Sequence, residues 1–196
     1  MSEIGRGSAV KAPMSGVAAS AWRLALALLL ASAACGGAEG APGHVGAPAP
    51  EYAAIRLDGD SVRLADLRGD VVLLNIWATW CHPCREEIPA LQELHERHAA
   101  QGLQVVGVSV DAGGLAEAGR VRAFADEFGV SYPIWLDPNE RVAREFFTIG
   151  VPTTVLIGRD GRIVWRHTGP IRPGDRSVSR MIEAALREPS PADGES

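Results

Sequence analysis

The stretch Val71-Val72-Leu73-Leu74-Asn75-Ile76-Trp77, followed by Trp80-Cys81-His82-Pro83-Cys84, decides the fold of this chain. Residues 71–77 are apolar without clean alternation, which is typical of a strand that is buried on both faces of a sheet. Residues 82–100 follow with a helical pattern. The sequence therefore predicts a buried strand that carries two cysteines, spaced two residues apart, to the first turn of a helix.

This placement favours redox chemistry at the two cysteines. The N-terminus of a helix offers unpaired N–H groups and a partial positive charge, and both stabilise a thiolate. We expect Cys81 to be the attacking thiol, because it lies at the helix start and nearer solvent. Cys84, one turn deeper, would then resolve the mixed disulfide. The predicted catalytic group is this redox-active pair, and no other cofactor is expected.

A zinc site is the first alternative for a Cys-x-x-Cys pair. A structural zinc ion needs four ligands, which two such pairs usually supply. The chain holds only three cysteines, and the third, Cys35, lies far from the pair in the sequence. We therefore predict no metal site, and a non-catalytic binding or metal-delivery module remains as an alternative.

Length and charge limit the remaining classes of function. The chain has 196 residues, enough for one ordinary domain with appendages, and its net charge is −5. It has no basic patch or stripe of the kind that contacts phosphate groups, and Lys11 is its only lysine. A nucleic-acid partner is therefore not expected.

Residues 1–35 have the pattern of an export signal. Arg6, Lys11 and Arg23 precede the apolar run at residues 24–34, which ends in small side chains. This run is too short to cross a membrane, since a spanning helix needs about 20 apolar residues. We expect an exported protein, located in the periplasm or on the outer face of the cell membrane.

Cys35 ends this run as Ala33-Ala34-Cys35-Gly36-Gly37, which resembles the lipobox of bacterial lipoproteins. The resemblance implies that a lipid is attached to Cys35 and tethers the protein to a membrane. Ser32 departs from the pattern, because the family usually has leucine there. Ordinary cleavage near residues 31–33 is the alternative. Residues 36–50 are rich in Gly, Pro and Ala and predict a flexible linker.

Residues 51–188 predict a single α/β domain with a mixed central β-sheet flanked by helices. It begins with a β-hairpin around Asp58-Gly59, and residues 189–196 are expected to be a disordered tail. The expected strands are residues 52–57, 61–64, 71–77, 103–110, 153–157 and 162–167, and the expected helices are residues 82–100, 117–128, 138–147 and 177–186.

The segments Asn75 to Pro89 and Gly150-Val151-Pro152-Thr153-Thr154 resemble the thioredoxin superfamily. Within it, the chain is similar to the TlpA/ResA group of exported thiol–disulfide oxidoreductases. The resemblance covers about residues 50–188, including Tyr132-Pro133-Ile134-Trp135-Leu136-Asp137. It implies a thioredoxin-like fold with a central inserted helical segment.

The resemblance also implies a proton acceptor for Cys84. Many thioredoxins place a buried aspartate six residues before the first cysteine, where this chain has Asn75, which cannot take a proton. In the TlpA/ResA group, a carboxylate at the position of Glu87 is thought to substitute. Glu87 shares a helix face with Cys84, and a raised pKa would let it accept the proton of that thiol. A surface glutamate near a helix start is the plain alternative.

Three further residues are implied in substrate binding. The family proline at the position of Pro152 follows a cis peptide bond and faces the cysteine pair. Val151 would then expose its backbone to an extended substrate, and Trp80 would form part of the docking surface.

His82, between the two cysteines, has two interpretations. A cationic imidazole would favour the Cys81 thiolate, while a solvated side chain would have little effect.

The resemblance implies a reductant that exchanges disulfides with envelope proteins. Relatives keep the cysteines of apocytochrome c or of oxidase-assembly proteins reduced, and a membrane electron donor of the DsbD/CcdA type recharges them. A peroxiredoxin-type peroxidase would share the fold, but its Pro-x-x-x-Thr-x-x-Cys pattern is absent. Ala78, not threonine, lies three residues before Cys81.

Overall fold

The computed structural model describes residues 43–190. Its strands are β1 (Ala53–Arg56), β2 (Ser61–Arg63), β3 (Val71–Trp77), β4 (Leu103–Ser109), β5 (Ile134–Leu136), β6 (Thr153–Ile157) and β7 (Ile163–Thr168). Its helices are α2 (His82–His98), α3 (Ala118–Glu127), α4 (Arg141–Glu145) and α5 (Arg176–Arg187), with the short 3-10 turns η2 (Leu64–Leu67), η3 (Ala99–Gln101) and η4 (Gly114–Glu117). Within residues 43–190, no helix is long and apolar enough to cross a membrane.

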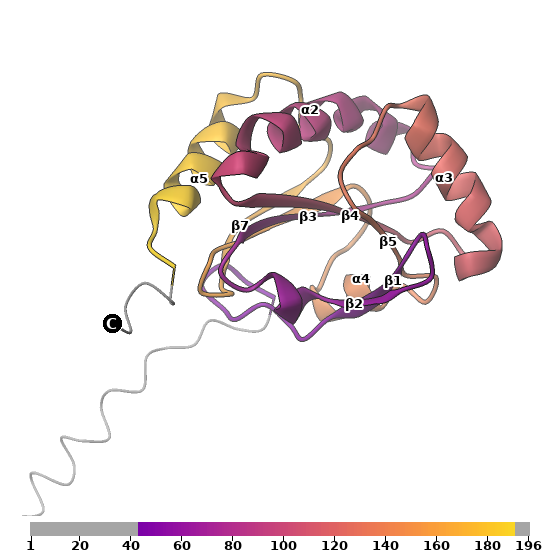
Figure 1. The fold of residues 1–196 in the computed structure, drawn as a ribbon, viewed down its shortest axis with the longest axis horizontal. Coiled ribbons are helices and arrows are strands. Elements are labelled where there is room, and N and C mark those ends of the chain that lie inside the picture. The colour runs from indigo at the N-terminus through magenta and orange to yellow at the C-terminus, as the bar shows by residue number, and fades with distance from the viewer. Residues whose placement is uncertain (1–42, 191–196) are drawn as a thin grey trace, which may run out of the picture. The chain divides into compact units, whose positions relative to one another are not determined.

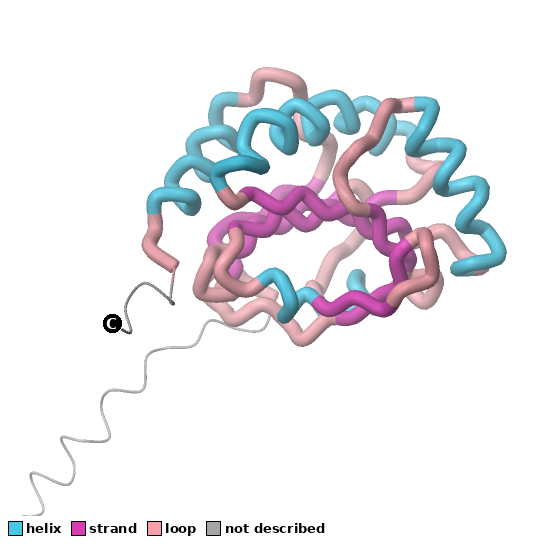
Figure 2. The backbone as a smooth tube through the Cα atoms, in the orientation of Figure 1, coloured by secondary structure: helices cyan, strands magenta, loops and turns pink. Residues whose placement is uncertain are grey.

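The seven strands form one mixed sheet in the order β2-β1-β5-β4-β3-β6-β7. Figure 2 shows the strands in magenta, with helices above the sheet. Strand β3 lies near its centre, parallel to β4 and antiparallel to β6. All seven residues of β3 are buried, as expected for a strand covered on both faces. The predicted fold class, a thioredoxin-like α/β domain with a mixed sheet, is confirmed.

The helices cover the sheet so that the N-terminus of α2 meets the end of β3. Helices α2 and α5 lie over one face (Figure 1), where Leu91 and Ile182 pack in one apolar cluster with Leu73. On the opposite side, the rings of Tyr52 and Phe146 meet edge to face with centroids 6.1 Å apart. Burying each large apolar side chain contributes roughly 1.5–3 kcal/mol, so both faces hold β3 in place.

Two elements differ from the sequence-based expectation. Strand β5 was not predicted from periodicity, because its three residues are too few to show alternation. The helix expected over residues 138–147 is shorter and spans only Arg141–Glu145. Its start is set by the carboxylate of Asp137, which accepts a 2.6 Å hydrogen bond from the N–H of Val142.

The predicted flexible linker at residues 36–50 is wrong for its last part. Residues 43–50 lie along β7, where Gly46 N–H donates to the carbonyl of Ile163 and Ala47 C=O accepts from its N–H. Ala49 N–H donates to the carbonyl of Gly161, and Ala47 is buried with 1% of its surface exposed. We call residues 43–50 the N-terminal strap. It pairs with a strand edge whose N–H and C=O groups would otherwise be open, while residues 36–42 lie outside the described part.

Replacing Ala47 with aspartate is expected to lower the free energy of unfolding by ~2 kcal/mol or more, because a carboxylate would be buried without a partner. The matched control is Val45→Asp in the same strap, where 58% of the residue is exposed and little change is expected. Urea unfolding followed by circular dichroism measures both variants. Equal midpoints for both would show that the strap is not part of the cooperative fold.

Candidate active site

The two cysteines lie at the start of α2 and form a disulfide with their Cα atoms 5.3 Å apart. Cys81 is the residue that caps the helix, and its Sγ accepts a 3.2 Å hydrogen bond from the N–H of Cys84. Cys81 has 4% of its surface exposed and Cys84 has 1%, so Cys81 is nearer solvent by a narrow margin. The sulfur of Cys81 therefore sits where the helix N-terminus favours negative charge.

Glu87 lies on the buried side of the same helix. Its Oε1 accepts a 2.8 Å hydrogen bond from Asn75 Nδ2, and its Oε2 accepts a 3.0 Å bond from the N–H of Ile171. Asn75 also donates to Thr154 Oγ1 at 3.0 Å. Since the side chains of β3 alternate between faces, Asn75 points toward α2 and reaches Glu87. The carboxyl group of Glu87 in α2 is thus held by hydrogen bonds from β3 and from the segment after β7.

Burial raises the pKa of Glu87 from 4.5 to about 7, while the hydrogen bonds from Ile171 and Asn75 lower it by less. Removal from water therefore outweighs the two donors, and the carboxyl group changes its charge near neutral pH. This direction agrees with the raised pKa that we expected, and the surface alternative does not describe Glu87, which has 0% of its surface exposed. It does describe neighbouring Glu86, whose side chain is 62% exposed. Proton exchange with Cys84 stays a prediction.

The Val151–Pro152 peptide bond is cis, as the resemblance implied. The N–H and C=O groups of Val151 form no hydrogen bond within residues 43–190. Beside it lies a cavity of about 240 Å³ whose lining includes Trp80, Ile149 and Val151. Trp80 is 68% exposed and Ile149 is 94% exposed. Two of the predicted substrate-binding residues, Trp80 and Val151, thus line one cavity, while Pro152 is buried directly after Val151.

The other predicted site residues lie apart from this surface or outside the described part. The side chain of His82 is 84% exposed, and its Nδ1 lies 3.5 Å from Glu86 Oε1, which favours the solvated interpretation. Cys35 lies outside residues 43–190. Within those residues, no group of three or more His, Cys, Asp or Glu side chains is placed to hold a metal ion.

Sequence reasoning missed two groups at the site. The first is the N–H of Ile171, which is 84 residues from Glu87 and has no sequence signal. The second is Asp111, a buried carboxylate two residues after the end of β4, which binds Thr79. The sequence did hold a signal for Asp111, because this acidic residue follows a buried apolar strand. Strands β3 and β4 are parallel, so their carboxyl ends lie at the same edge of the sheet and place Asp111 near the turn that follows β3.

Comparison with known proteins places this geometry in a family. The sequence pattern of the AhpC/TSA family matches residues 45–166. The chain belongs to the AhpC/TSA family. Within it, the chain is 35% identical to the thiol-disulfide oxidoreductase ResA of Geobacillus kaustophilus over 140 residues, which cover 71% of this chain and 77% of the relative. A second ResA, from Bacillus thuringiensis (strain Al Hakam), is 30% identical over 148 residues, with coverage of 76% and 80%.

Solved structures agree with this family assignment. A thiol:disulfide interchange protein of the thioredoxin family from Chlorobium tepidum TLS matches with a TM-score of 0.62 and 28% identity, covering 76% of this chain and 99% of the other. A secreted thiol-disulfide isomerase from Corynebacterium glutamicum matches with a TM-score of 0.63 and 26% identity, covering 71% and 85%. The AhpC/TSA protein described here is a thioredoxin-like thiol–disulfide oxidoreductase, and protein thiols and disulfides are its substrates.

Proposed function

We propose that this protein is an exported, membrane-tethered reductant that opens disulfides in envelope proteins through Cys81 and Cys84. The observation that carries the exchange chemistry is Glu87, a buried carboxyl group with a pKa of about 7 on the helix face of Cys84, and the reducing direction follows from the TlpA/ResA resemblance. A base at the second cysteine assists the step in which a dithiol completes the reduction of its substrate. The ResA relatives and the secreted neighbour support an exported location.

The exchange proceeds in two balanced steps. The Cys81 thiolate attacks one sulfur of the substrate disulfide, forms a mixed disulfide and releases the other substrate sulfur as a thiolate. Glu87 then accepts the proton of Cys84, whose sulfur attacks Cys81 Sγ and releases the second substrate thiolate. The protein loses two electrons and ends as the Cys81–Cys84 disulfide, while the substrate gains them and takes up two protons as a dithiol.

Substrate docking uses the surface around the cis peptide bond. An extended segment that carries the target disulfide pairs with the free backbone of Val151. Pro152 keeps that backbone turned to the site without an N–H of its own. Trp80 and Ile149 line the cavity and supply apolar contact, because both residues are largely exposed. This surface selects peptide segments with apolar side chains next to the reacting cysteine.

The proposed partners follow from the TlpA/ResA resemblance. Apocytochrome c and oxidase-assembly proteins are the proposed substrates, and a membrane donor of the DsbD/CcdA type returns the two electrons. Cys35, with an attached lipid, tethers the protein near such a donor. Ordinary signal cleavage near residues 31–33 would leave the chain unlipidated, and mass spectrometry of the mature N-terminus distinguishes the two forms.

The direction of electron flow is tested by the reduction potential of the Cys81–Cys84 pair in glutathione buffers. We expect a potential in or below the range of glutaredoxins, about −200 to −230 mV, where a dithiol is a useful reductant. A potential near that of DsbA, about −120 mV, would assign the protein to oxidation instead. Thiol alkylation followed by mass spectrometry reads the fraction of each form.

A further inference from the structure

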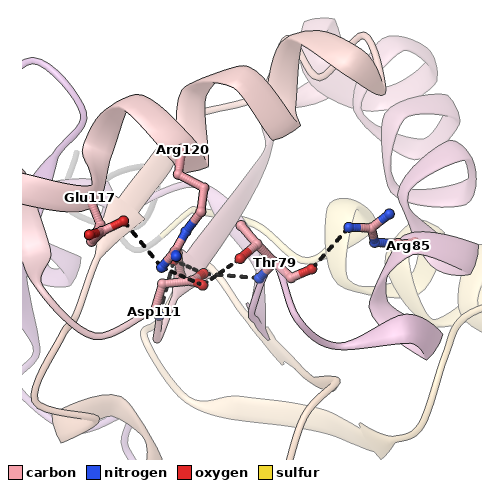
Figure 3. Close-up of polar contacts among 6 residues, drawn as sticks. Thr79, Arg85, Asp111, Glu117 and Arg120 are labelled. Carbon is pink, nitrogen blue, oxygen red and sulfur yellow. Dashed lines mark hydrogen bonds and ion pairs between the residues drawn. The ribbon is translucent and has the colours of Figure 1, made fainter.

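Thr79, two residues before Cys81, has every polar group of its backbone and side chain bound by charged side chains from two other elements (Figure 3). It lies in the turn between β3 and α2. That turn is closed by a 3.1 Å hydrogen bond from Cys81 N–H to the carbonyl of Ala78. Thr79 is therefore held by hydrogen bonds at its N–H, its carbonyl and its hydroxyl, within the segment that delivers the attacking cysteine.

Asp111 binds Thr79 from the end of β4. Its Oδ2 accepts a 3.0 Å hydrogen bond from the N–H of Thr79, and its Oδ1 accepts a 2.6 Å bond from the threonine hydroxyl. Ser109 Oγ donates to the same carboxylate at 2.8 Å. Asp111 is buried with 3% of its surface exposed, and such a carboxylate is stable only when its oxygens are well paired.

Arg85 binds Thr79 from the first turns of α2. Its Nη2 donates to the carbonyl of Thr79 at 3.3 Å, and its guanidinium lies 5.0 Å from the centre of the Phe124 ring. A cation near a helix N-terminus is disfavoured by the helix dipole. The contacts of Arg85 with Thr79 and Phe124 offset that repulsion. Arg85 therefore stabilises the turn before α2, although it lies in the helix itself.

We propose that Asp111 and Arg85 act as positioning residues that hold Thr79, and with it Cys81 Sγ, at the N-terminus of α2. This set of three residues is called the Thr79 clamp. The inference rests on the proposed function of Cys81 as the attacking thiol. The side chains of Thr79, Asp111 and Arg85 form no hydrogen bond with the sulfur of Cys81 or Cys84, so the clamp acts on rate through position.

The physical basis is the short range of helix-terminus stabilisation, which fades within the first turn. A turn that can shift carries the Cys81 thiolate away from the N–H groups of α2 and lowers its population. The charge of Asp111 acts in the opposite sense, because a carboxylate near a thiolate disfavours it. When Asp111 is neutralised, the loss of position therefore predicts less Cys81 thiolate, whereas the loss of negative charge predicts more. The charged and titratable groups around the turn are Asp111, Glu117, Arg120, Arg85, His82 and Glu140.

Thr79→Val and Asp111→Asn test the clamp in the full-length protein. Valine keeps the shape of threonine and replaces the hydroxyl, which donates to Asp111, with a methyl group, while asparagine replaces one acceptor oxygen with a donor. The reduced protein is alkylated with iodoacetamide across pH, and mass spectrometry locates the label on Cys81. We expect both variants to alkylate about threefold more slowly at neutral pH, with the pH midpoint shifted upward.

Two controls accompany these variants. Thr79→Ser keeps the hydroxyl and the N–H, so it should retain the rate of the unmodified protein. Glu117→Gln changes the exposed end of the same network, where Glu117 contacts Arg120 at 3.3 Å, and should also leave the rate unchanged. Near-ultraviolet circular dichroism checks that each variant is folded, and Thr79→Val carries the test if Asp111→Asn does not fold.

Two outcomes would overturn the clamp. Faster alkylation in Asp111→Asn with no change in Thr79→Val would show that Asp111 acts through its charge. Unchanged rates in both folded variants would show that the turn holds its position without the hydrogen bonds between Thr79 and Asp111, which would remove Asp111 from the clamp. Neither result bears on whether the protein reduces or oxidises its substrates, since alkylation of Cys81 needs no protein substrate. The reduction potential tests that separate point.

Discussion

Cys84→Ser is expected to stop catalysis after the first exchange and to leave substrate proteins covalently joined to Cys81. Without the second thiol, nothing inside the protein can attack the mixed disulfide. Cys84 is placed for that attack, because it lies one helical turn from Cys81 with the Cα atoms 5.3 Å apart. Disulfide reductase turnover should fall to the uncatalysed rate, while the adduct accumulates in amounts comparable to the protein itself.

Non-reducing electrophoresis and mass spectrometry of the full-length variant detect the adduct and identify the trapped partner. Cys81→Ser is the matched control and should form no adduct, because it lacks the attacking sulfur. A Cys84→Ser protein that keeps its turnover, or that yields adducts only through Cys35, would contradict the assigned roles. Normal function together with stoichiometric bound metal would favour the metal-delivery alternative.

Glu87→Gln is expected to slow the resolving step by about 100-fold at pH 7, which is the low end of general acid–base contributions. In the unmodified protein, this step should accelerate as pH rises through about 7, because Glu87 must be ionised to accept a proton. The reduced protein is mixed rapidly with a substrate disulfide at each pH, and acid quenching at successive times captures the mixed disulfide at Cys81. Its rate of disappearance is the rate of the resolving step. The control is Glu86→Gln on the exposed side of the helix, which should leave the rate of the resolving step unchanged. If Glu87→Gln keeps the pH profile of the unmodified protein, Glu87 is excluded as the proton acceptor.

The same substitution has an expected effect on stability. The pKa of Glu87 is higher in the folded protein, about 7, than the ordinary value of 4.5, so the folded state binds the proton more tightly. Its favourable contribution is complete below pH 4.5 and is lost as pH rises toward and through 7. The difference in pKa corresponds to roughly 3 kcal/mol. Glu87→Gln should therefore remove a fall in unfolding free energy between pH 5 and pH 8, as read by urea titrations at each pH.

Much of the fold and part of the site could be predicted from local pattern. The apolar run at residues 71–77 is β3 with the same bounds, and the helix after Cys81 begins at His82. Pairs of residues a turn apart, such as Cys84 and Glu87, share a face in any helix. The short strand β5 was not predictable in this way, because its pairing with β1 and β4 joins segments far apart in the chain. The start of α4 depends on one hydrogen bond from Val142 N–H to the carboxylate of Asp137, five residues earlier, and hydrophobic periodicity carries no sign of it.

The sequence by itself determined that two cysteines follow a buried strand at a helix start, because spacing and periodicity are properties of neighbouring residues. Only the tertiary structure decided what surrounds them. The pKa of Glu87 depends on burial beneath β3 and the segment at Ile171. The position of Cys81 depends on Asp111, whose carboxylate reaches across from β4. Desolvation and hydrogen bonding act between atoms close in space, and folding brings these groups together from positions far apart in the chain.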